Sequence, residues 1–101
     1  MAKEEIRTLN SRSFFLLTCI RRSVIRGCEE NEQSLIITVE NKGGVICFTL
    51  KDLATDKCEI LENPETGVYE LPLKKGGKYQ FTITANFAKG KYKIQKKTII
   101  E

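Results

Sequence analysis

Lysine residues in the last third of the chain offer the clearest candidate for binding chemistry. Eight lysines and no acid lie between residues 71 and 100. On a strand, side chains two residues apart share a face, and an ammonium group on that face could neutralise a phosphate while Phe87 stacks on a base. The alternative is an edge strand whose lysines oppose aggregation. Gln95 would lie on the same face as the candidate binding residues, which are Lys89, Lys91, Lys93 and Lys97.

Four cysteines form the second group with possible chemistry: Cys19, Cys28, Cys47 and Cys58. An even number allows two disulfides in three connectivities. The spacing matches no zinc ribbon, and we expect no metal or other cofactor. Free cysteines would be small apolar strand residues in a reducing cytoplasm, whereas paired cysteines would indicate a secreted protein.

Catalysis is not predicted. The chain has no histidine, so the usual acid–base group at neutral pH is missing. A cysteine or serine nucleophile would need a lysine or carboxylate base, and no such pair is indicated, although Cys47 and Cys58 could be neighbours on paired strands. The acid pairs Glu29–Glu30 and Asp52/Asp56 fall in expected loops. We therefore predict that the protein is not an enzyme.

Charge is distributed unevenly along the 101 residues, a length that fits one domain. Residues 1–27 carry six cations and two acids, residues 28–70 carry ten acids and three lysines, and residues 71–100 are basic. These segments are either solvated strand faces that pair across sheets or part of a basic face for an anionic partner. The longest apolar run, Phe14–Leu17, is too short to span a membrane.

Alternating apolar and polar residues predict seven strands separated by turn signals, as in an all-β antiparallel sandwich. Asn41–Gly44 is expected to be a hairpin loop, Asn86–Gly90 a second loop, and Lys57–Glu62 a polar edge strand. Residues 1–11 lack a clear period and are predicted to be a mobile tail or a short helical turn. The expected strands are Ser13–Ile20, which is buried and could continue to Arg26, Ser34–Glu40, Val45–Lys51, Lys57–Glu62, Val68–Leu73, Lys78–Ala85 and Lys91–Ile99.

A short motif before the sixth strand, Leu73-Lys-Lys-Gly-Gly-Lys-Tyr79, resembles the corner between strands E and F of fibronectin type III domains. The resemblance implies an immunoglobulin-like sandwich with a Greek-key connection, in which the Tyr79 hydroxyl bonds to upstream backbone, Gly76 supplies the turn and Leu73 packs under the ring. Lys75 replaces the proline of that family, and its core tryptophan is missing. The resemblance implies a binding or spacer module and no activity.

Two functional hypotheses follow. The first is a non-catalytic interaction module that binds another protein through a sheet face or the loops at one end. The second is a small basic protein that binds nucleic acid or a nucleoprotein, for example as an inhibitor, through its lysine-rich C-terminal strand.

Overall fold

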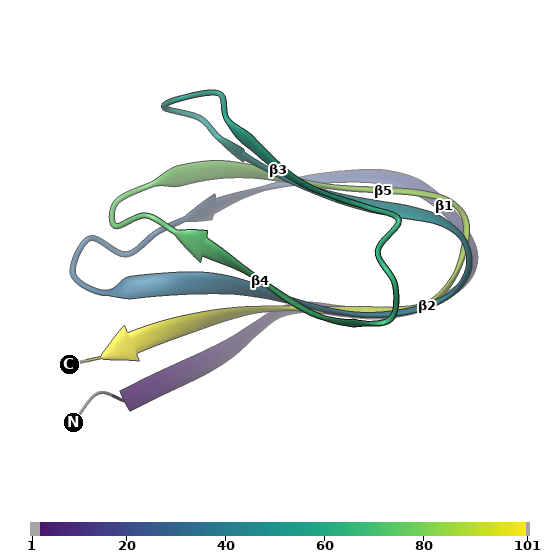
Figure 1. Ribbon diagram of the computed structural model, residues 1–101, viewed down its shortest axis with the longest axis horizontal. Helices are drawn as coiled ribbons and strands as arrows, with labels where there is room; N and C mark the ends of the chain where they lie inside the picture. Colours follow the sequence, from purple (N-terminus) through teal and green to yellow (C-terminus); the bar gives the residue numbers. More distant parts are fainter. Residues whose placement is uncertain (1–2, 101) are drawn as a thin grey trace.

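The protein consists of five strands in the computed structural model, which describes residues 3–100 (Figure 1). These residues form no helix, and therefore the described part of the chain contains no helix that could cross a membrane. Every pair of neighbouring strands is antiparallel, which confirms the all-β antiparallel prediction. The strands are β1 (Lys3–Arg26), β2 (Glu32–Asp52), β3 (Cys58–Glu62), β4 (Gly67–Leu73) and β5 (Lys78–Ile100).

A single sheet folds over on itself to make two layers (Figure 1). The long strands β1, β5 and β2 lie side by side and bend near their middles, so each contributes to both layers. β3 extends the upper layer of Figure 1 by pairing with Cys47–Lys51, and β4 extends the lower layer by pairing with Gln33–Val39. The order is therefore β1-β5-β2-β3 in the upper layer and β1-β5-β2-β4 in the lower layer.

Bulges and positive φ angles bend the three long strands at one place. Leu16, Gly44 and Phe87 have φ of 58°, 70° and 49°, and the pairing register shifts beside them. A bulge inserts an extra residue and bends its strand. The expected loops Asn41–Gly44 and Asn86–Gly90 are these bends. The predicted strands Ser34–Glu40 and Val45–Lys51 are both parts of β2, and Lys78–Ala85 and Lys91–Ile99 are both parts of β5. The structure therefore has five strands rather than the seven predicted.

The N-terminal segment is part of the sheet, contrary to the prediction of a tail over residues 1–11. Lys3–Ser11 pair with the end of β5, from Ile100 back to Lys93. A register shift between Thr8 and Asn10 interrupts the alternation of side chains, so the sequence shows no clear period there. Met1 and Ala2 lie outside the described residues.

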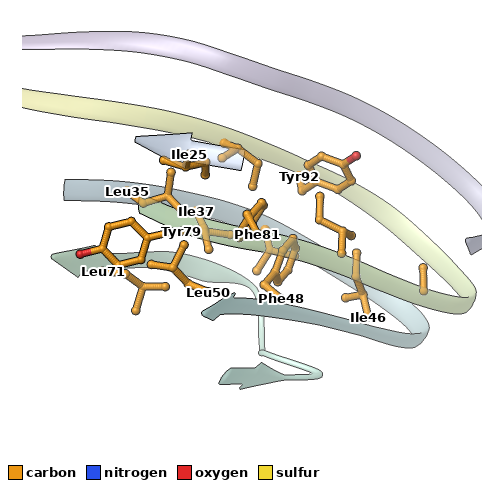
Figure 2. Packing of buried hydrophobic residues seen from close by; sticks show 14 of the residues in the cluster. Ile25, Leu35, Ile37, Ile46, Phe48, Leu50, Leu71, Tyr79, Phe81 and Tyr92 are labelled. Atoms are coloured by element: carbon orange, nitrogen blue, oxygen red, sulfur yellow. The ribbon is translucent and has the colours of Figure 1, made fainter. Parts of the chain in front are cut away.

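Buried side chains from both layers meet between them (Figure 2). The Phe48 ring stacks on Phe81 with centroids 6.2 Å apart and meets the Tyr92 ring edge-on at 5.9 Å. Alternation along the strands sends every second residue inward, as the sequence pattern predicts. The core comprises Ile25, Leu35, Ile37, Val39, Ile46, Phe48, Leu50, Leu71, Leu73, Tyr79, Phe81, Ile83, Ala85, Ala88, Tyr92 and Ile94.

Three strands form the edges of the folded sheet. β3 ends the sheet order, as predicted for Lys57–Glu62, and β4 pairs only with β2. β1 is the opposite edge, so the prediction that Ser13–Ile20 is buried is wrong: Phe15 and Ile20 are 76% and 63% exposed. β5 lies between β1 and β2. The alternative in which its lysines protect an edge strand is therefore also wrong.

Candidate interaction surface

Exposed apolar side chains are concentrated on edge strand β1. This strand contributes six of the eleven large hydrophobic residues that are exposed among the described residues. An edge strand also presents backbone N–H and C=O groups that no neighbouring strand satisfies, so it can pair with another chain. We call these side chains and the free backbone edge of β1 the β1 surface. Its apolar members are Ile6, Leu9, Phe15, Leu16, Ile20 and Val24.

A groove of about 620 Å³ opens between the two layers beside β1. Leu9 and Asn10 line it from the lower layer and Arg21–Ile25 from the upper layer, together with the core residues Phe81 and Ile83. Register places Arg21 opposite Ile83 and Ser23 opposite Phe81, so polar side chains of β1 occupy core-facing positions. The hydrophobic interior is consequently covered less completely on this side.

The outside of the bend carries a second group of exposed apolar residues. Phe15 and Leu16 of β1, Val45 of β2 and Phe87 of β5 are all exposed there. Leu16 and Phe87 also adopt the left-handed backbone conformation, which costs a residue with a Cβ atom about 1–3 kcal/mol. The Lys89 ammonium lies 5.0 Å from the centre of the Phe15 ring, so this aromatic ring is one partner of a predicted site lysine.

The four predicted site lysines all lie on β5: Lys89 is in the bend, and Lys91, Lys93 and Lys97 are in the lower layer. Lys91 is 3.4 Å from Glu40 of β2, and Lys97 is 3.1 Å from Glu70 of β4 and 4.0 Å from Glu4 of β1. Within residues 3–100, Lys93 forms no ion pair. The structure therefore places the lysines on one strand, and acids of neighbouring strands accompany two of them.

Two of the carboxylates beside these lysines, Glu40 and Glu70, have lowered pKa values. The pKa of Glu40 is lowered first by the hydrogen bond from Lys42 and then by Lys91. The pKa of Glu70 is lowered first by the hydrogen bond from Lys97 and also by Ser34. Both acids are therefore ionised at neutral pH, and they offset part of the positive charge that a phosphate would meet.

The motif at the start of β5 forms a compact turn. The Tyr79 hydroxyl accepts a hydrogen bond of 2.8 Å from the backbone N–H of Lys74. Gly76 has a φ of 68° within the turn, and Leu73 and Tyr79 both belong to the buried core. These contacts join the end of β4 in the lower layer to the start of β5 in the upper layer.

None of the four cysteines forms a disulfide within the chain. Cys47 and Cys58 are not neighbours, because register places them opposite Glu62 and Lys51, at the two ends of β3. Hydrogen bonds from the backbone N–H of Glu30 first, and then from that of Asn31, lower the pKa of the Cys28 thiol. Over residues 3–100 the structure contains no cluster of three or more His, Cys, Asp or Glu side chains that could hold a metal ion.

The β1 surface was not anticipated from the sequence, although a signal for it exists. Ile20, Arg22 and Val24 alternate with Arg21 and Ser23, so both faces of this segment carry a polar residue. A fully buried strand would carry charge on neither face. Two adjacent arginines after an apolar run therefore indicate an edge.

Comparison with known proteins supports the fold at a coarse level. No protein-family model and no curated protein matches the chain. A family two carbohydrate esterase from Cellvibrio japonicus is similar in structure at 10% sequence identity and a TM-score of 0.51, covering the whole chain but only 35% of the esterase. A chain from the disulfide-linked pili of Bacillus endospore appendages has 9% identity and a TM-score of 0.51, covering 99% of this chain and 89% of that one. At these identities the likeness concerns the fold alone.

Proposed function

We propose that this protein is a non-catalytic interaction module that binds another protein through its β1 surface. The supporting observation is that the edge strand β1 carries most of the exposed large hydrophobic residues. A strand from the partner would pair with the free backbone edge of β1 through backbone hydrogen bonds. The side chains of the partner strand would contact the apolar residues of the β1 surface and the groove.

The charge of β1 favours an acidic partner. The strand contains six cations and only two acids. Complementary charge speeds encounter and disfavours basic competitors. The preferred partner therefore presents an extended segment with acidic and apolar residues.

The non-catalytic part of the proposal rests on the residues themselves. The chain has no histidine to act as a base at neutral pH, and Cys47 and Cys58 lie at opposite ends of β3 rather than beside each other.

The immunoglobulin-like assignment is part of this proposal. It is supported by the hydrogen bond between Tyr79 and the Lys74 backbone, which connects the two layers as a tyrosine corner does. Domains with this corner commonly act as binding or spacer modules.

Site-specific photo-crosslinking tests the proposed function. A benzophenone amino acid replaces Val24 on β1 or, as the control, Leu53 in the loop after β2, and each protein is irradiated in an extract of the cells that produce it. Both positions are exposed, so we expect a defined protein adduct from position 24 and none from position 53. Absence of any adduct from position 24, or equal adducts from both positions, would refute the proposal.

Nucleic-acid binding is the competing function, favoured by the outward-facing Lys91 and Lys93. Joint replacement of Lys89, Lys91, Lys93 and Lys97 by Gln tests it with labelled single-stranded RNA and duplex DNA in fluorescence anisotropy. We expect no sequence-specific binding by the wild type at physiological salt. A sub-micromolar complex that this variant loses, and that weakens steeply as salt rises, would favour the competing function.

A further inference from the structure

Opposite charges lie on opposite sides of the folded sheet. β1 and β5, the two basic strands, are neighbours, whereas the two edge strands on the other side, β3 and β4, contain three acids and no cation. Figure 1 views the molecule along its shortest axis, with β3 and β4 nearest the viewer and β1 among the most distant parts. The uneven charge distribution in the sequence therefore becomes a basic edge and an acidic edge.

Strand directions would allow these two edges to pair. β1 runs parallel to β2, because each is antiparallel to β5. β3 and β4 are both antiparallel to β2, so they are also antiparallel to β1. A second molecule placed in the same orientation beyond β3 and β4 would present its β1 antiparallel to both strands. The upper and lower layers would then both continue across the contact.

We propose that the partner of the β1 surface is a second copy of this chain, whose β3 and β4 pair with β1. This inference rests on the proposed function and specifies its partner. The contact joins two different surfaces, so it is heterologous and repeats head to tail. Each added copy leaves one basic edge and one acidic edge free at the two ends of the assembly.

Side chains in the upper layer support this pairing. The outward residues of β1 include Arg22 and Val24, and those of β3 include Ile60 and Glu62. Ile60 and Val24 are 61% and 57% exposed. The antiparallel register that places Ile60 against Val24 also places Glu62 against Arg22. One register therefore covers two exposed apolar side chains and pairs two opposite charges.

The same register brings two thiols of different copies near each other. With Ile60 against Val24, Cys58 lies opposite Arg26, two residues before Cys28. Two residues of extended chain span about 7 Å. Cys58 is exposed and Cys28 is partly exposed, so a flexible bismaleimide should join them between copies.

Sedimentation velocity of the full chain over a wide concentration range tests the proposal. We expect the wild-type sedimentation coefficient to rise with concentration beyond that of a dimer. Val24→Lys and Ile60→Lys each place a charge on one of the two edges, and each variant alone should remain monomeric. Val45→Lys on the interior strand β2 is the matched control, because Val45 is exposed and lies on neither edge. This control should associate as the wild type does.

A mixture of the two edge variants gives the sharpest result. The Val24→Lys protein keeps its acidic edge and the Ile60→Lys protein keeps its basic edge, so an equimolar mixture should form dimers and nothing larger. Crosslinking gives a second readout. With the bismaleimide, the wild type should form a ladder of crosslinked oligomers, and neither the Cys28→Ser protein nor the Cys58→Ser protein should form one alone. A mixture of these two variants should give a crosslinked dimer.

Two results would overturn the inference. A wild type that stays monomeric at every concentration would exclude self-association. The proposed function would survive that result if the photo-crosslinker at position 24 captured a different protein. Association that Val24→Lys abolishes and Ile60→Lys leaves intact would indicate pairing of two β1 strands instead. Circular dichroism of every variant verifies that the sheet is retained.

Discussion

The two ends of the folded sheet are held together in different ways. At the closed end, where the long strands bend, the backbones of β2 and β5 approach so closely that a Cβ atom on Gly44 would overlap the carbonyl group of Phe87. At the open end, side chains secure the turns. The Tyr79 hydroxyl accepts a hydrogen bond from the Lys74 N–H, and the side-chain amide oxygen of Gln33 (Oε1) accepts a hydrogen bond of 2.7 Å from the Cys28 N–H.

This difference determines how each end should respond to mutation. A close approach of two backbones leaves no room for an added atom, and the strands cannot relax separately because they are paired on both sides of the bend. A side-chain hydrogen bond is a single interaction, and its loss leaves the surrounding turn in place. The closed end should therefore be intolerant of small changes, whereas the open end should lose stability in modest steps.

The largest effect is expected for Gly44→Ala at the closed end. The new methyl group would overlap Phe87, and the φ of 70° disfavours any residue with a Cβ atom. We expect the free energy of unfolding to fall by about 3 kcal/mol or more, measured by urea denaturation.

Gly67→Ala is the matched control for this substitution. A Cβ atom there would meet its nearest neighbour at 3.9 Å, and the position has no positive φ. Its free energy of unfolding should stay within about 0.5 kcal/mol of the wild type. Equal stability of the two glycine variants would show that the backbones do not approach closely at the bend.

A smaller effect is expected for Tyr79→Phe at the open end. The change keeps the buried ring and removes the acceptor of the Lys74 N–H. Leaving that donor unpaired should lower the free energy of unfolding by about 1–2 kcal/mol.

Tyr69→Phe serves as the comparison, because the Tyr69 hydroxyl donates an exposed hydrogen bond to the Glu65 carbonyl. Water can replace an exposed partner, so a loss of only a few tenths of a kcal/mol is expected. If the Tyr79→Phe protein is as stable as the Tyr69→Phe protein, the hydrogen bond from the Lys74 N–H to the Tyr79 hydroxyl does not stabilise the fold.

The smallest effect concerns Asp52, the last residue of β2. Its carboxylate accepts a 2.9 Å hydrogen bond from the Ala54 N–H, the main cause of its lowered pKa, and lies 3.4 Å from the Lys74 ammonium. The unfolded chain therefore binds this proton at a higher pH than the folded chain does. The carboxylate stabilises the fold at neutral pH, and that contribution disappears as the pH falls below about 5.

Asp52→Asn should flatten this part of the pH dependence. Denaturation midpoints measured between about pH 7 and pH 3 should fall more for the wild type than for the variant. Parallel curves for the two proteins would mean that the Asp52 carboxylate has the same pKa in the folded and unfolded chains.

The sequence predicts the inward-facing residues better than the connections between strands. Leu35, Ile37 and Val39 alternate with polar residues and are buried as predicted. The prediction of a hairpin loop at Asn41–Gly44 is wrong because asparagine and glycine permit the positive φ angles of a hairpin and those of a bulged bend equally. A hairpin reverses the chain whereas a bend continues it, and local residue preferences do not distinguish the two.

The candidate site was harder to predict than the core. The lysines of β5 are outward-facing as expected, but their position between two strands depends on pairing with β1, which is distant in the sequence. Phe15 and Ile20 suggested burial because apolar residues are usually inside. Which side of a strand remains unpaired is decided by the whole sheet, so an edge can expose apolar residues that a local pattern assigns to the core.

The pairing of β1 with β5 has a consequence for synthesis of the protein on the ribosome. Lys3 pairs with Ile100 and Arg26 with Lys78, so β1 is translated first and remains without its only neighbour until residues 78–100 emerge. Folding therefore follows translation of the whole segment. Such distant pairing also makes folding slow, in the range of milliseconds to seconds. During that interval the apolar stretch around Phe14–Leu17 is open to chaperones, and to the same segment on nascent chains of neighbouring ribosomes.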